Sequence, residues 1–196
     1  EKFTGDIGAL YFDNDIPKPN VTVESYLTYY AAYTSQTTKN SYQSQANVDE
    51  REPIKTFYTS IIESNKIKID SKVNLMKQKL SQGGILEIVL VGSASSPANE
   101  TYNDALSQRR INAVKKYFLE TLGLQTYLDN KQITLVEIAD GETIVIPESE
   151  IGDVVNIFDS VNCTQNLTGN DKIYSTNAMA CRRVKLTVND KTPVPV

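Results

Sequence analysis

One short segment constrains the fold of this chain more than any other. Residues Ile85 to Gly92 form an almost entirely apolar run that is interrupted only by Glu87. Gly83 and Gly84 end the helical pattern before the run, and a polar loop follows it from Ser93 to Glu100. Such a run is typical of a central β-strand that is covered on both faces. It is far shorter than the roughly 18 apolar residues needed to span a membrane.

The segments before this strand carry strand, helix and loop patterns in turn. Residues Gly8 to Asp13 predict a short strand, and the tyrosines between Val21 and Thr34 are spaced for one face of a helix. Residues 35–52 are polar and are predicted to form a surface loop. An apolar stripe at helical spacing then runs from Ile54 to Leu80, directly after Pro53, a residue favoured in the first turn of a helix.

The segments after the strand continue the alternation. Residues Thr101 to Leu122 predict a helix, and Ile133 to Ile138 predict another strand. Residues 140–168 have no clear period and are interpreted as an irregular insertion. Between 184 and 188, apolar residues alternate with Lys185 and Thr187, which predicts a half-exposed last strand.

This order of elements, βαβαββ, predicts the fold class. Strands that alternate with helices favour an α/β (α+β) fold, here a two-layer sandwich in which helices cover one face of a mixed β-sheet. A length of 196 residues suits one domain with insertions. We expect a single domain over residues 1–191, with insertions near 14–52 and 140–170, and a tail or linker at 192–196.

The composition excludes several classes of function. The net charge is −4 and no dense run of Lys and Arg occurs, which disfavours nucleic acid as a partner. No segment is apolar for long enough to span a membrane. The chain has no His, so the usual general base and the commonest transition-metal ligand are both missing. The sequence therefore favours a binding or structural module over an enzyme, and we expect no cofactor and no metal site.

The two cysteines, Cys163 and Cys181, leave two alternatives open. In an oxidising compartment they can form a disulfide that closes a loop of about eighteen residues, which would contribute on the order of 3 kcal/mol to stability. In a reducing compartment they would be two small buried apolar side chains. Two cysteines are too few for a structural zinc site.

The predicted helix after residue 100 carries an arginine in an unusual position. Arg110 falls in the middle of the helix face that holds the apolar residues Tyr102, Leu106, Ala113, Val114 and Tyr117. A guanidinium there is costly unless an anion or another acceptor meets it. One interpretation is a site for the carboxylate of a ligand, bound in bidentate fashion near the helix N-terminus. The others are an ion pair with an internal Asp or Glu, or a side chain that extends along the surface to water.

The same segment resembles the peptidoglycan-binding signature of OmpA-like domains. In that family a strand ending in Gly is followed by a polar loop and then by Asn-x-x-Leu-Ser-x-x-Arg at the start of a helix. The matching residues here are Gly92, Asn103, Leu106, Ser107 and Arg110. The run from Cys181 to Leu186 resembles the closing strand of the family, and Leu10 to Asp13 resembles its opening strand.

The resemblance implies a periplasmic, outer-membrane-associated module of a Gram-negative cell envelope. The family binds the diaminopimelate of peptidoglycan stem peptides, with a loop Asp that binds the ammonium group and the helix Arg that binds the carboxylate. Arg110 matches this Arg, whereas Ser95 stands where the Asp would be. A hydroxyl contributes no charge, and its hydrogen bond is weaker by roughly 1–2 kcal/mol than a charge-assisted one.

The resemblance thus leaves two functions. In the first, the module binds peptidoglycan, with Ser95, Asn103, Leu106 and Ser107 shaping a pocket around Arg110, and Arg182 or Arg183 lining it from the last strand. In the second, the chain is an OmpA-like scaffold that binds another envelope protein and no longer binds peptidoglycan. We expect an exposed, unpaired Arg110 beside an open pocket in the first case, and an Arg110 paired with an internal carboxylate in the second.

Overall fold

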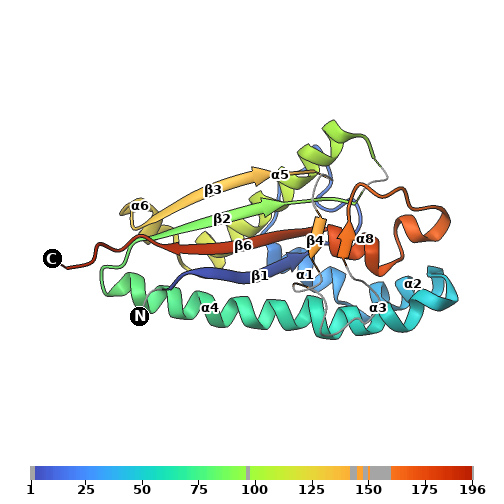
Figure 1. The fold of residues 1–196 in the computed structure, drawn as a ribbon, viewed down its shortest axis with the longest axis horizontal. Helices are drawn as coiled ribbons and strands as arrows, with labels where there is room; N and C mark the ends of the chain where they lie inside the picture. Colours follow the sequence, from blue (N-terminus) through green and yellow to red (C-terminus); the bar gives the residue numbers. More distant parts are fainter. Residues whose placement is uncertain (1–2, 96–97, 142–144, 148–149, 151–159, 196) are drawn as a thin grey trace.

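A computed structural model describes residues 3–95, 98–141, 145–147, 150 and 160–195 of the chain. At its centre lies a four-stranded mixed sheet (Figure 1). The strands are β1 (Gly5–Tyr11), β2 (Leu86–Gly92), β3 (Ile133–Ala139) and β6 (Arg183–Asp190), in the order β1-β6-β2-β3. Strand β6 is antiparallel to both of its neighbours, and β2 is parallel to β3.

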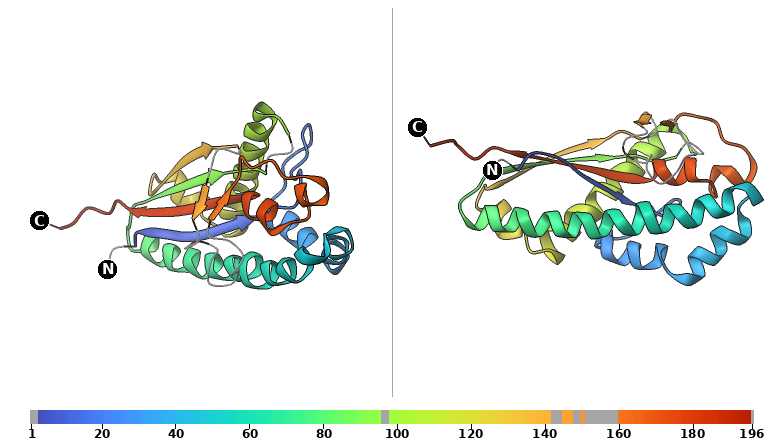
Figure 2. Two further views of the ribbon diagram at one scale, coloured as in Figure 1. Left: turned by 45° about the vertical axis from the view of Figure 1, so that its right-hand side comes forward. Right: turned by 60° about the horizontal axis from the view of Figure 1, so that its bottom comes forward.

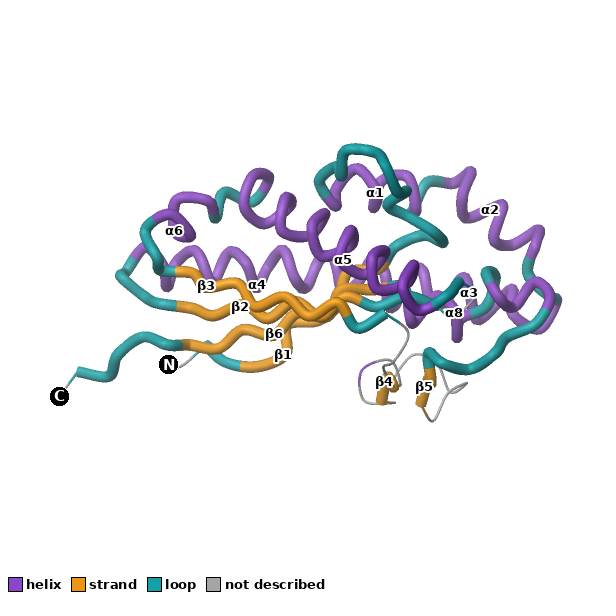
Figure 3. Tube along the Cα trace, turned by 90° about the horizontal axis from the view of Figure 1, so that it is seen from above, coloured by secondary structure: helices purple, strands orange, loops and turns teal. Residues whose placement is uncertain are grey.

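Helices cover one face of this sheet, as Figure 3 shows from above. A continuous helical stretch consists of α3 (Arg51–Phe57), a π-helical segment (Tyr58–Glu63) and α4 (Ser64–Ser81). After β2 come α5 (Glu100–Lys116), a second π-helical segment (Tyr117–Thr121) and α6 (Gln125–Asp129). Apolar side chains of α4 and α5 pack on those of β2 and β6 to form the main core. The predicted fold class is confirmed.

The prediction that β2 is covered on both faces is wrong. Its side chains alternate along the strand, with Leu86, Ile88 and Leu90 fully buried against the helices and Glu87, Val89 and Val91 only half buried. Among the described residues, no helix therefore covers β2 on the far face of the sheet. Because β2 carries apolar side chains on both faces, nothing in the sequence indicated that only one face is fully buried.

The predicted surface loop at residues 35–52 is largely helical, so that prediction is also wrong. Helix α1 (Tyr26–Tyr33) is followed by α2 (Gln36–Gln45) and a 3-10 turn (Val48–Glu50). Ser35 begins α2 by accepting a hydrogen bond from the backbone N–H of Thr38 at 3.3 Å. Tyr42 is the one residue of this helix that is buried, and it packs between Tyr33 and Tyr58. The other positions face water, so the helix can be polar.

The second insertion builds a smaller layer on the other side of the sheet (Figure 3). It contains β4 (Val145–Pro147) paired with β5 (Ser160–Asn162). A 3-10 turn (Gly169–Lys172) and α8 (Thr176–Cys181) then lead into β6. Apolar residues of the insertion, including Ile146 and Val161, form a second core with Tyr11 and Phe57. The short apolar piece in the sequence at 154–158 lies outside the described residues.

The two ends of the described chain lie at the same end of the sheet (Figure 2). Asp190, the last residue of β6, joins them. Its carboxylate accepts hydrogen bonds from the backbone N–H groups of Phe3 at 3.2 Å and Thr192 at 2.9 Å, and it forms an ion pair with Lys79 of α4. Thr192, the first residue of the predicted tail, accepts a hydrogen bond through its hydroxyl from the backbone N–H of Ile85 at 3.0 Å.

Candidate functional site

The predicted site lies where β2 ends and α5 begins. Asn99 caps α5 by accepting a hydrogen bond from the backbone N–H of Tyr102 at 2.9 Å. Gly92 at the end of β2 lies directly against the helix, since a Cβ added to it would be 2.5 Å from the backbone oxygen of Ser107. The absence of a side chain at Gly92 therefore sets how closely α5 approaches the sheet.

We expect Gly92→Ala to lower the free energy of unfolding by about 2 kcal/mol, as overpacking in a filled core does. The added methyl would meet the helix backbone, which cannot rotate away as a side chain can, so α5 must shift. Chemical denaturation of the wild type and the variant measures the difference. An unchanged denaturation midpoint would show that α5 can move away from the sheet without any loss of folding free energy.

Arg110 is fully buried, and its guanidinium is bound by the backbone of the chain itself. Its Nε donates to the carbonyl of Ile16 at 3.0 Å, its Nη1 to Ser93 at 2.7 Å and its Nη2 to Asp13 at 3.2 Å. The guanidinium also lies 5.5 Å from the centre of the Phe12 ring. The neighbouring Arg109 donates to the carbonyl of Pro17 at 2.8 Å. Both arginines therefore hold residues 13–17 against the start of α5.

This arrangement differs from every interpretation based on the sequence. Arg110 is not exposed to water, and it is not paired with a carboxylate. Three backbone carbonyls accept its hydrogen bonds instead. Burial, and then the positive charge of Arg182, lower the pKa of Arg110 to about 9, so the guanidinium remains charged at neutral pH. It is a structural cation that fixes the first insertion.

A pocket of about 230 Å³ nevertheless opens beside Arg110. It brings together four of the predicted site residues with four others: Asn14, Asp15, Ser95, Ala98, Tyr102, Asn103, Leu106 and Arg110. Ser107 is buried beneath it, and its hydroxyl donates to the carbonyl of Asn103 at 2.8 Å. The predicted placement of Ser95, Asn103 and Leu106 around Arg110 thus agrees with the geometry, whereas Ser107 acts inside the helix.

Asp15 brings to this pocket a carboxylate that was not predicted there. It accepts hydrogen bonds from the hydroxyl of Tyr102 and from Lys18 Nζ, the latter at 2.6 Å. Burial alone would raise the pKa of Asp15, but these two donors outweigh it and lower the pKa below its ordinary value. Asp15 belongs to an insertion, so the family motif gave no signal for it.

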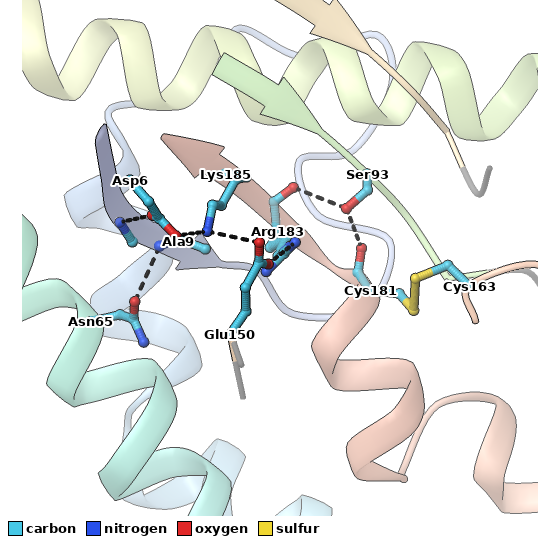
Figure 4. A network of polar contacts seen from close by, with 10 residues as sticks. Asp6, Ala9, Asn65, Ser93, Glu150, Cys163, Cys181, Arg183 and Lys185 are labelled. Carbon is cyan, nitrogen blue, oxygen red and sulfur yellow. Dashed lines mark hydrogen bonds and ion pairs between the residues drawn. A yellow bond between two sulfur atoms is a disulfide. The ribbon is translucent and has the colours of Figure 1, made fainter. Parts of the chain in front are cut away.

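Arg182 or Arg183 was expected to line the pocket from the last strand, but neither does. Arg183 points to the sheet face that carries the second insertion, where its Nη2 pairs with Glu150 Oε2 at 2.7 Å (Figure 4). Lys185, two residues along β6, pairs with Glu150 Oε1 at 3.1 Å and with Asp6. Strand alternation puts both cations on this face, so they fasten the insertion to the sheet.

Arg182 is fully buried among aromatic rings. Its Nη2 donates to the carbonyl of Ile173 at 2.5 Å, and its guanidinium lies 6.0 Å from the centre of the Tyr42 ring. It contacts neither the pocket beside Arg110 nor Arg183's partner Glu150. The sequence could not separate the roles of these adjacent arginines, because they point to opposite sides of the chain.

Cys163 and Cys181 form a disulfide, which decides between the two alternatives that the sequence left open (Figure 4). Beside it, the buried hydroxyl of Ser93 donates to the carbonyl of Cys181 at 2.7 Å. The bond ties the strand pair of the second insertion to the segment that enters β6.

Within the described ranges, no group of three or more His, Cys, Asp or Glu side chains is placed to hold a metal ion. None of the helices in those ranges is both long enough and apolar enough to cross a membrane. No family model matches the chain, and no curated protein matches it.

Proposed function

We propose that this chain is a non-catalytic, OmpA-like scaffold or protein-interaction module of the Gram-negative cell envelope that no longer binds peptidoglycan through Arg110. One observation carries the proposal: the guanidinium that would bind a ligand carboxylate is buried, and it donates to three backbone carbonyls. A ligand would have to displace residues 13–17 to reach it. The partner of such a module is another envelope protein.

The strand order and the positions of the motif residues support the OmpA-like part of the proposal. Gly92 ends β2, the Asn103 to Arg110 motif lies within α5, and Arg183 begins β6. The disulfide supports an oxidising compartment such as the periplasm. The lack of His, together with the structural use of the buried arginines, supports a role without catalysis.

The second candidate is weak binding of a peptidoglycan stem peptide, and the pocket beside Arg110 is the observation that favours it. Asp15 and the Tyr102 hydroxyl lie on its wall, where a carboxylate can bind the ammonium group of diaminopimelate. Asp15 already pairs with Lys18, which the ligand would have to replace. Ser95 adds only a buried hydroxyl.

Titration with a diaminopimelate-containing muropeptide separates the two candidates. We expect no saturable heat signal in calorimetry at millimolar ligand, because a surface carboxylate alone binds an ammonium group weakly. Saturable binding that is lost in Asp15→Asn and strengthened in Lys18→Ala would establish the second candidate and overturn the first. Lys115→Ala, on the far part of α5, is the matched control and should behave like the wild type.

A further inference from the structure

Six buried side-chain N and O atoms in the described part of the chain have no hydrogen-bond partner, and four of them come from three neighbouring residues. These four are the hydroxyl oxygens of Tyr33 and Tyr58 and the Nε and Nη1 atoms of Arg182; the other two belong to Arg109 and Arg183. The side chains of Tyr33, Tyr58 and Arg182 are at most 2% exposed. An unsatisfied buried donor is strongly unfavourable, so a cluster of them indicates a missing acceptor.

The side chains that carry these four atoms lie close together in the fold. The rings of Tyr33, Tyr42 and Tyr58 are 5.3–5.9 Å apart, centre to centre, and the Arg182 guanidinium lies 6.0 Å from the centre of the Tyr42 ring. We call these four residues the Arg182 cage. Its members come from α1, α2, the π-helical segment before α4 and the junction between α8 and β6. The first insertion therefore contributes Tyr33 and Tyr42 to it.

The cage carries excess positive charge. Arg182 and the nearby Arg110 are both buried cations, and no ion pair among the described residues includes either of them. Asp13 is the carboxylate beside them, and its Oδ1 already accepts from the Tyr42 hydroxyl at 2.6 Å and from the backbone N–H of Asn14 at 2.7 Å. One carboxylate cannot balance two buried guanidinium groups.

The tyrosines do not supply the missing negative charge. Burial raises the pKa of Tyr33 and Tyr42 well above the ordinary value, and that of Tyr58 rises for the same reason. Their hydroxyls therefore stay protonated. The four unsatisfied atoms can thus all act as donors at neutral pH.

We propose that the Arg182 cage is a buried binding site for a small monovalent anion of halide size. An anion accepts hydrogen bonds from guanidinium and hydroxyl donors alike, and it neutralises the excess charge, which a water molecule does not. Because the cage is closed to solvent, the anion binds as the chain folds and stabilises the folded state. This inference does not depend on the envelope function proposed above.

Crystals grown in sodium bromide test the site directly. We expect an anomalous bromide peak within hydrogen-bond distance of Arg182 Nε or Nη1 and of the Tyr33 or Tyr58 hydroxyl. Water molecules at that position without anomalous signal, or no density at all, would overturn the proposal.

Thermal unfolding tests it in solution. At constant ionic strength, with gluconate exchanged for bromide from about 1 to about 100 mM, the midpoint of the wild type should rise by about 5 °C. The variants Tyr33→Phe and Tyr58→Phe keep the rings but remove one donor each, so each should bind bromide about tenfold more weakly. Tyr127→Phe, in α6 and outside the cage, is the control and should respond like the wild type. An equal response in all four proteins would contradict an anion bound in the cage.

Discussion

Arg110→Met is expected to lower the free energy of unfolding of the ligand-free protein by about 3–5 kcal/mol. Methionine keeps much of the side-chain length but donates no hydrogen bond. The carbonyls of Asp13, Ile16 and Ser93 would then lose their partner in a largely buried setting. Chemical denaturation monitored by far-ultraviolet circular dichroism measures the loss.

The matched control is Lys115→Met on the same helix. Lys115 forms a half-exposed ion pair with Glu137 at 3.0 Å, and such pairs contribute at most about 1 kcal/mol. If Arg110 served only to bind a ligand, its removal would change the free energy of unfolding little. The substitution would even remove the unfavourable free energy of burying its charge. If Arg110→Met is as stable as the Lys115 variant, the structural role of Arg110 is wrong, and with it the main support for the scaffold proposal.

Asp190→Asn is expected to destabilise the protein by about 2–3 kcal/mol at pH 7, because it removes the charge from a buried carboxylate paired with Lys79. Burial alone would raise the pKa of Asp190, but the bonds from Lys79, Thr192 and Phe3 outweigh it and lower the pKa far below its ordinary value. A carboxyl whose pKa is lower in the folded state stabilises that state above the unfolded pKa of about 3.9. This contribution is lost as the pH falls further, through the folded pKa.

Denaturation curves at several pH values between about 7 and 2 test this sign. The wild type should lose stability below about pH 4, and the difference from Asp190→Asn should shrink in the same range. Asp129→Asn, an exposed residue that accepts only from Gln125 at 2.9 Å, serves as the control and should follow the wild type. A difference between the wild type and Asp190→Asn that stays constant across this range would rule out the lowered pKa.

The layers of the fold follow from periodicity in the sequence, because β2, α5 and β6 each bury a regular set of apolar side chains. Helix α2 escaped prediction because it buries only Tyr42 and is held by a serine cap. The partners of Arg110 could not be read from any pattern. They are backbone carbonyls, which every residue has, and two of them lie 94 and 97 positions away in the chain.

The pairing of β1 with β6 has a mechanical consequence. The strands are antiparallel, Gly5 lies opposite Val188, and both chain ends leave from the same end of the sheet. Tension applied between the ends pulls along the direction of the interstrand hydrogen bonds rather than across them. The interstrand hydrogen bonds therefore break one after another, starting at the chain ends. The contacts of Asp190 with Phe3 and Lys79 are the first to bear the applied force.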